Sequence, residues 1–266
     1  MTIQLRVVAC PYCKGVCNVK GDQMRIGHIS DFHLRDALPG SSAVATRRSR
    51  EMPEKIALAL DQFRAEGVDW VAVTGDLVDH PFNDMHSTEN LERGEADLQL
   101  VRSLLERVSC PVFVLYGNHD HPLLFRRVFN MQSEGVDVGD FRVFCFYDEE
   151  GADHVPVRVG AELERFDRAL SDEGPQQIHL QHYLVHPEHN EGYPHTYGTA
   201  GWLKQSMQRS GQVHLLLSGH YHPGVLPQKD GGIHYAVAPA FCEAPHRFAV
   251  YECDAHRVQT HWLQID

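Results

Sequence analysis

The sequence predicts an α/β fold in which two mixed β-sheets pack face to face and helices cover their outer faces. Two observations lead to this prediction. Up to residue 223, short apolar runs rich in β-branched residues alternate with longer stretches of helical periodicity. From Gly224 onward the pattern contains strands alone, with breaks at Gly231-Gly232 and Asp254-Ala255-His256. No internal repeat interrupts this order, so we expect residues 24–266 to form a single domain.

Each expected element has its own signal. Five apolar runs are predicted to be buried strands, at residues 25–30, 68–74, 111–116, 178–181 and 213–218. Apolar residues at helical spacing predict helices at 53–66, 92–108, 122–130, 161–170 and 200–209. A further strand is expected at 141–147. The antiparallel finish of the chain is expected to contain strands at 225–228, 233–238, 248–252 and 258–263.

A polar cluster follows each of the five buried strands. In chain order the clusters are Asp31-Phe32-His33, Gly75-Asp76-Leu77-Val78-Asp79, Gly117-Asn118-His119-Asp120, His182, and Gly219-His220-Tyr221-His222. Open α/β sheets gather ligand sites at the carboxyl ends of their strands, so we expect these clusters to meet. Carboxylates, imidazoles and an amide oxygen suit manganese, iron and zinc, whereas thiolates, which the clusters lack, select softer metals. The sequence therefore predicts a centre for two metal ions.

These clusters resemble the motifs of the calcineurin-like metallophosphoesterases over residues 31–222. The motifs D-x-H, G-D-x-x-D, G-N-H-D, a lone His after a strand, and G-H-x-H occur in the family's order. The resemblance implies a four-layer αββα sandwich. It also implies hydrolysis of a phosphoester by a hydroxide held between two ions of Mn, Fe or Zn.

The resemblance further implies a role for each matching residue. The ligands of the first ion are expected to be Asp31, His33, Asp76 and His222. The second ion is expected to share Asp76 and to bind Asn118, His182 and His220. His119 would protonate the leaving oxygen, and Asp120 would orient its ring.

The fourth cluster leaves a choice among three histidines. His179 alternates within the predicted strand and is expected to point sideways or into the core. His182 stands where the strand ends and is the expected ligand, with His186 as the reserve. Asp79 is expected to cap a turn or to accept a hydrogen bond from a ligand imidazole.

The class of substrate is implied by a finer resemblance. This chain resembles the class III cyclic-nucleotide phosphodiesterases in three features. These are the segment 30–34, the region 138–170, and a length that leaves little room for an extra capping domain. That implies a phosphodiesterase acting on a small, nucleotide-like substrate. The group commonly has His-His-Pro-Pro at the fourth motif, whereas this chain has His-Tyr-Leu-Val-His-Pro at residues 182–187. Whether the natural substrate is a cyclic nucleotide therefore stays open.

Two alternatives remain. A phosphomonoesterase, including a protein phosphatase, would need more positive charge at the phosphate, which Arg47, Arg48 and Arg50 would supply if their loop folded inward. We expect that loop to be solvated. A non-catalytic scaffold that binds partners would be expected to lack ligands or the catalytic histidine, and none is missing.

Composition is consistent with an enzyme domain. The chain has 266 residues, 42% of them hydrophobic, and a formal net charge of −12, which argues against an extended nucleic-acid interface. We expect the partner to be a small phosphoester. No apolar run reaches the roughly 18 residues of a membrane span, and the N-terminus lacks an export signal, so we expect a cytoplasmic protein. The oligomeric state is left open.

The first residues stand apart. Met24 begins a segment that resembles the start of many members of the family, so residues 1–23 are expected to be a disordered extension or a product of start-codon choice. Cys10, Cys13 and Cys17 have no fourth ligand nearby, which leaves open whether they form a metal clip or have no role.

Overall fold

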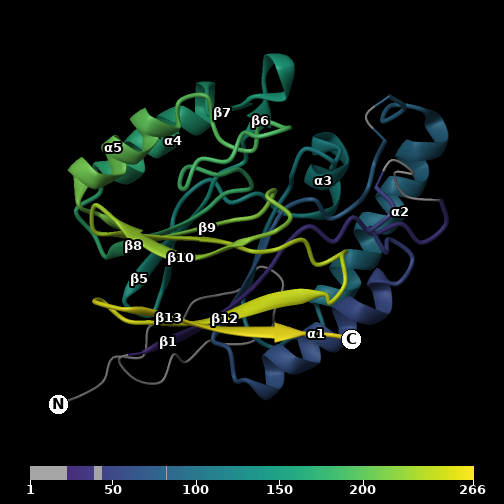
Figure 1. The fold of residues 1–266 in the computed structure, drawn as a ribbon, viewed down its shortest axis with the longest axis horizontal. Coiled ribbons are helices and arrows are strands. Elements are labelled where there is room, and N and C mark those ends of the chain that lie inside the picture. The colour runs from purple at the N-terminus through teal and green to yellow at the C-terminus, as the bar shows by residue number, and fades with distance from the viewer. Residues whose placement is uncertain (1–22, 39–43, 82) are drawn as a thin grey trace.

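The computed structural model describes residues 23–38, 44–81 and 83–266. The expectations for residues 1–22, including those for Cys10, Cys13 and Cys17, lie outside the described residues. Within them the chain forms two large mixed sheets that pack face to face, with helices on the outer sides (Figure 1). The predicted fold class is confirmed.

The first sheet has five strands in the order β13-β12-β1-β2-β3. Its parallel part consists of β1 (Met24–Ile29), β2 (Trp70–Thr74) and β3 (Val112–Leu115). Its antiparallel part consists of β12 (Arg247–Cys253), which pairs with β1, and β13 (Val258–Gln264). The connections between the parallel strands contain α1 (Met52–Ala65) and α2 (Thr88–Leu105).

The second sheet has six strands in the order β10-β11-β9-β8-β5-β4. Four of them are parallel: β5 (Phe141–Cys145), β8 (Gln176–Leu180), β9 (Val213–Ser218) and β11 (Ile233–Val237). The antiparallel edges are β4 (Val136–Val138) and β10 (Val225–Asp230). Helices α4 (Gly160–Leu170) and α5 (Ala200–Ser210) lie on the outer side of this sheet (Figure 1).

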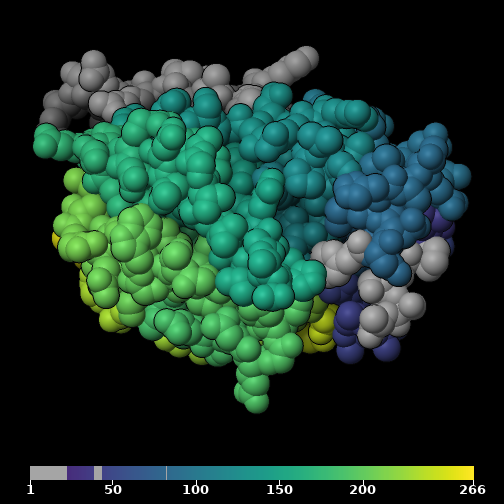
Figure 2. Space-filling view, turned by 90° about the horizontal axis from the view of Figure 1, so that it is seen from above, coloured from purple at the N-terminus to yellow at the C-terminus, as the bar shows by residue number. Residues whose placement is uncertain are grey.

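Smaller elements complete the fold. Helix α3 (Pro122–Val128) packs against α2. A two-stranded hairpin consists of β6 (Glu149–Glu150) and β7 (Pro156–Val157), with the short helix η1 (Ala152–His154) between them. The middle of the chain, coloured teal and green, forms much of the surface seen from above (Figure 2).

The sheets are held by one apolar core, which extends from the space between them to the buried faces of α1 and α2, and by a second core under α4 and α5. Every residue of β2 and β3 is buried, as expected for parallel strands covered on both faces. Helix α1 buries Ile56, Leu60 and Phe63, which recur at helical spacing, and begins with a proline in its first turn. The layers therefore position the strand ends rigidly.

The end of the chain differs from the prediction. The strands after Gly224 do not form one antiparallel finish: β10 and β11 join the second sheet, where β11 runs parallel to β9, and β12 and β13 join the first. Apolar patterning shows where a strand lies but not which sheet it enters, because both sheets bury the same residue types. None of the described helices has the length and apolarity needed to cross a membrane.

Candidate metal centre

The five polar clusters meet where the parallel strands of both sheets end. Backbone hydrogen bonds join them: the amide of Asp31 donates to the carbonyl of Gly75 at 3.0 Å, and the amide of Gly219 donates to the carbonyl of His182 at 2.9 Å. The side chains thus come from strands of two different sheets, and all seven residues expected as ligands lie in this region. They are Asp31, His33, Asp76, Asn118, His182, His220 and His222.

Asp31, His33 and His222 form the first group of donor atoms, which lie within 4.8 Å of one another. Nε2 of His33 is 4.0 Å from Oδ1 of Asp31, and Nε2 of His222 is 3.8 Å from the same oxygen. Two imidazole nitrogens and a carboxylate oxygen therefore face a common point.

Asp76 lies between this group and a second one. Its Oδ2 is 3.3 Å from Nε2 of His33, whereas its Oδ1 is 3.5 Å from Nε2 of His182. His220 completes the second group, and Oδ1 of Asn118 lies 3.1 Å from Nε2 of His182. One carboxylate thus presents a different oxygen to each group of donors.

The donor atoms fit divalent cations. Oδ1 of Asp31, Nε2 of His33 and Nε2 of His220 are buried and have no hydrogen-bond partner among the described residues. Buried polar atoms without a partner are costly, and a cation would supply one. Donors at about 2.0–2.2 Å from one ion lie roughly 3 Å apart, close to the separations seen around Asp76. Mixed oxygen and nitrogen donors suit Mn, Fe and Zn.

Burial shapes the charges of this centre. It raises the pKa of Asp31 and lowers the pKa of His33 to about 3, because both groups lose their hydration. At His182 burial also acts against the charged form, but the carboxylates of Asp76 and Asp31 and the carbonyl of Thr74 together outweigh it and raise the pKa to about 9. Burial raises the pKa of Asp76, but His182 and His33 together hold it well below its usual value.

The backbone at four of the expected ligands is strained. Asp31, His33, Asp76 and His220 have φ angles of 56°, 43°, 51° and 66°, in the left-handed region that residues other than glycine seldom adopt. Such conformations cost of order 1 kcal/mol or more each and persist where function requires them. Gly117 lets the chain pass close to the donors, because a Cβ there would collide with Oδ1 of Asp76.

Hydrogen bonds outside the donor groups fix the ligand rings. Nδ1 of His182 donates to the carbonyl of Thr74 at 2.7 Å, and Nδ1 of His222 donates to Oε1 of Glu243 at 2.6 Å. Each bond leaves Nε2 to face the site. No pattern in the sequence pointed to Glu243, which is far along the chain and reaches the site because the amide of Cys242 donates to the carbonyl of Asp31 at 3.1 Å.

The three histidines of the fourth cluster take different places. His182 faces Asp76, as described. His179 is buried with its ring centroid 5.0 Å from that of Phe146, in the core under α4. His186, the reserve candidate, packs on Tyr235 with ring centroids 5.0 Å apart, outside the donor groups.

The carboxylate beside the His119 ring is Asp79, which corrects the expectation for Asp120. Nδ1 of His119 lies 3.1 Å from Oδ1 of Asp79. Asp120 instead accepts hydrogen bonds, each 2.9 Å long, from the backbone amides of Leu77, Val78 and Gly117. Asp120 therefore holds together the loops after β2 and β3. Asp79 is also 3.4 Å from Nδ1 of His33, one of the expected ligands.

Arg47 corrects a second expectation. Its side chain is only 8% exposed, and its Nη1 donates to Oδ1 of Asp79 at 2.6 Å. The solvated loop predicted for the three arginines applies to Arg48, which is exposed, and to Arg50, which binds the carbonyls of Asp36 and Ala37 at the surface.

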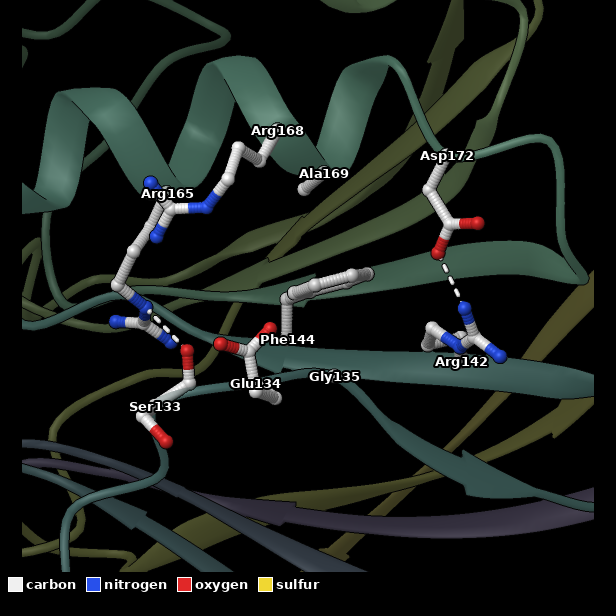
Figure 3. Close-up of a pocket in the computed structure, with 9 residues that line it drawn as sticks. All are labelled: Ser133, Glu134, Gly135, Arg142, Phe144, Arg165, Arg168, Ala169 and Asp172. Atoms are coloured by element: carbon white, nitrogen blue, oxygen red, sulfur yellow. Dashed lines mark hydrogen bonds and ion pairs between the residues drawn. The ribbon is translucent and has the colours of Figure 1, made fainter.

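A cavity of about 350 Å³ opens onto the centre. Besides predicted site residues, its lining includes Tyr193, His195 and Arg47, and the sequence had left open a place for Arg47 at the phosphate only as an alternative. A different cavity, of about 420 Å³, lies beside α4 and β5 (Figure 3). Its Arg142 pairs with Asp172, and it contains none of the predicted site residues, so it is not the metal centre.

Comparisons with known proteins point to the same family as the motifs. A family model described as calcineurin-like phosphoesterase matches residues 24–224. No curated protein sequence matches the chain.

Solved structures show the same fold. The chain is similar to a dimetal phosphatase from Danio rerio, with a TM-score of 0.68 and 17% identity over 91% of this chain and 99% of that one. It is similar to TT1561 of Thermus thermophilus, with a TM-score of 0.57 and 13% identity over 90% and 98% of the two chains. It is also similar to GAP50, the anchor in the inner membrane complex of Plasmodium, with a TM-score of 0.53 and 12% identity over 92% and 90%.

Proposed function

This chain belongs to the calcineurin-like phosphoesterase family, and we propose that it hydrolyses phosphoesters with two divalent cations bound at the meeting strand ends. The observation that carries this proposal is the position of Asp76, whose two oxygens face separate groups of donors at 3.3 and 3.5 Å. A shared carboxylate is what a pair of ions about 3.5–4 Å apart requires.

The residues have separate tasks in this proposal. Asp31, His33, Asp76 and His222 would hold one ion, and Asp76, Asn118, His182 and His220 the other. When bound, two such cations make water acidic enough to attack phosphorus and offset charge on the phosphoryl oxygens. Thr74 and Glu243 keep two of the ligand rings in place through the hydrogen bonds described above.

His119 is the proposed proton donor for the leaving oxygen. It lines the cavity beside Asp76 and Asn118. Because Asp79 engages Nδ1 of the ring at 3.1 Å, the other nitrogen, Nε2, is the one placed to exchange a proton with the substrate. Asp79 thus takes the orienting role that the motif had suggested for Asp120.

We propose a small phosphodiester, nucleotide-like in character, as the substrate. The cavity volume of about 350 Å³ is that of a small-molecule site. The rings of Tyr193 and His195 line it, and aromatic faces of this kind can stack on a planar base. These features support the resemblance of the sequence to nucleotide phosphodiesterases.

Hydrolysis of phosphomonoesters is the second candidate, and the position of Arg47 favours it. A monoester dianion gains more from a nearby guanidinium than a diester monoanion does, because it carries more charge. A scaffold without catalysis is the third candidate, since the Plasmodium anchor protein has this fold; against it, all the expected ligands are present here.

The proposal is tested by assaying the manganese-loaded protein with bis-p-nitrophenyl phosphate and p-nitrophenyl phosphate. We expect two ions per chain, faster hydrolysis of the diester, and loss of one ion and of activity in Asp76→Asn. A faster monoester reaction would favour the second candidate. An Asp76→Asn variant with unchanged metal content and activity would refute the site.

A further inference from the structure

The loop that carries Arg47 is anchored to the rim of the metal centre. Arg47 pairs in an isolated antiparallel bridge with Glu243, the residue that holds His222. On either side, the amide of Arg48 donates to the carbonyl of Cys242 at 2.9 Å and the amide of Arg35 donates to the carbonyl of Ser49 at 3.2 Å. The backbone of Arg47 is therefore fixed beside the cavity before any substrate enters.

The guanidinium of Arg47 is held at one end and incompletely paired at the other. Nη1 donates to Oδ1 of Asp79 at 2.6 Å, whereas Nη2 lies 3.4 Å from Nε2 of His119. Nε is buried and has no hydrogen-bond partner among the described residues. Nε and Nη2 form one edge of the planar group, so Asp79 orients the guanidinium through Nη1, and that edge has no oxygen acceptor among the described residues.

A purely structural ion pair explains this arrangement poorly. Asp79 already faces two imidazoles, those of His33 and His119, and does not depend on Arg47 for a partner. A buried N–H without an acceptor is costly, so a structural arginine would be expected to pair its donors more fully. An anionic oxygen in the cavity, next to His119, would give them an acceptor.

We propose that Arg47 binds a phosphoryl oxygen of the substrate and strengthens the binding of dianionic phosphate groups over monoanionic ones. The inference rests on the proposed hydrolysis at the same centre. A planar guanidinium matches phosphate oxygens in geometry, and prior fixation by Asp79 limits the entropy lost on binding. Its contact with the ring of His119 places the bound oxygen beside the proposed proton donor.

The charge of the substrate determines how strongly the loss of Arg47 should lower the rate of hydrolysis. The Coulomb energy between a guanidinium and a dianion is about twice that with a monoanion at the same distance. Loss of the positive charge should therefore lower the rate constant for a monoester by roughly the square of the factor for a diester. If the diester loses about 10-fold, as for one charge-assisted hydrogen bond, the monoester should lose about 100-fold.

The experiment compares wild type with Arg47→Gln, Arg47→Lys and the control Arg48→Gln, all loaded with manganese. Arg48 is an exposed arginine on the same loop, so its variant should keep wild-type kinetics. The readouts are kcat/KM for p-nitrophenyl phosphate and for bis-p-nitrophenyl phosphate, and the Kd of inorganic phosphate by calorimetry at pH 8. Manganese content and thermal unfolding are measured alongside.

We expect Arg47→Gln to lower the monoester-to-diester ratio of kcat/KM about 10-fold and to raise the phosphate Kd by about 100-fold. Arg47→Lys, which keeps the charge but loses the planar edge, should lie between. Folded, manganese-loaded variants with the wild-type ratio and phosphate Kd would overturn the inference.

Two further outcomes remain decisive. If Arg47→Gln does not fold, Arg47→Lys decides, and a wild-type ratio there overturns the inference. If wild-type protein with two manganese ions hydrolyses neither ester, the proposed function has failed. The phosphate titration then tests Arg47 separately, and equal Kd values in wild type and Arg47→Lys would refute its role.

Discussion

Asp79 holds the ring of His119: its Oδ1 lies 3.1 Å from Nδ1 of the histidine. The same oxygen is 3.4 Å from Nδ1 of His33 and 2.6 Å from Nη1 of Arg47. One buried carboxylate thus contacts a proposed ligand of the first ion, the proposed proton donor and the arginine beside the cavity. These contacts pull the pKa of Asp79 well below its usual value against the opposing effect of burial.

We predict that Asp79→Asn lowers kcat by about 100-fold or more, the typical contribution of a positioned general acid. The amide carries no charge to hold the two imidazoles and Arg47 in their present orientation. Steady-state kinetics of diester hydrolysis with manganese measures the change. A kcat within about 2-fold of wild type would contradict the role given to Asp79.

Asp120→Asn is predicted to act on stability rather than on the proton donor. Its carboxylate accepts three backbone hydrogen bonds, and an amide cannot accept all of them. We expect the free energy of unfolding to fall by about 1–3 kcal/mol, the cost of a buried amide N–H without a partner. Urea unfolding of the metal-free protein measures it, and wild-type stability in this variant would oppose our interpretation of Asp120.

These two aspartates show where sequence reasoning succeeds and where it stops. Apolar runs identified the strands, and strand ends converge by a general rule, so the meeting of the expected ligands could be predicted without a structure. Which carboxylate meets His119 depends on side-chain direction in the turns after β2 and β3. Asp120 follows His119 directly in the sequence, which suggested that the two side chains would be in contact. Neighbouring side chains in a turn point in different directions, so this adjacency did not identify the carboxylate beside His119.

Glu243→Gln is predicted to weaken metal binding. The carboxylate accepts the Nδ1–H of His222 at 2.6 Å and so fixes the ring that would ligate the first ion. Loss of such a bond lowers metal affinity by about 10- to 100-fold. Competition with a manganese-sensitive dye measures the affinity, and Glu173→Gln, on an exposed loop, is the matched control. Equal affinities in the two variants would exclude this role.

Gly117→Ala is predicted to displace the second ion. A Cβ at this position would collide with Oδ1 of Asp76 and would lie 2.6 Å from Nε2 of His182. Both atoms would have to move, so we expect the bound manganese to fall from two ions toward one. The control is Gly201→Ala in α5, where nothing lies within 4 Å of the added Cβ. Metal analysis that finds two ions in Gly117→Ala would contradict the packing described.

His28 is predicted to make the fold sensitive to acid. The ring is buried between the hydroxyls of Thr74 and Tyr251, and burial lowers its pKa to about 3. Unfolded chains bind this proton near pH 6.5, so as pH falls from there toward 3 stability decreases by about 1.4 kcal/mol per pH unit for this one group. Stability contributed by neutral His28 is complete above pH 6.5.

The measurement is urea unfolding at pH 7.5, 6.0 and 5.0 with a chelator present, in wild type and His28→Gln. Glutamine cannot take up the proton, so the free energy of unfolding of His28→Gln should fall less than that of wild type between pH 7.5 and 5.0. Parallel pH dependences in the two proteins would show that His28 is not the group responsible.

Other parts of the site could not be predicted from the sequence for a common reason. Arg47 and Glu243 reach the centre through loops of opposite halves of the chain that pair as an isolated bridge, and no periodic pattern marks such loops. The short strands β4, β6 and β7 carry too few residues for an alternating pattern to be visible. The meeting of strand ends can be predicted from the sequence, whereas the pairing of two loops can be seen only in the folded structure.

The central claim is that Asp76 bridges two cations. Anomalous diffraction from crystals soaked in manganese tests it most directly. We predict two anomalous peaks about 3.5–4 Å apart, one on the His33 side of the Asp76 carboxylate and one on the His182 side. A single peak, or peaks that do not contact Asp76, would contradict the claim.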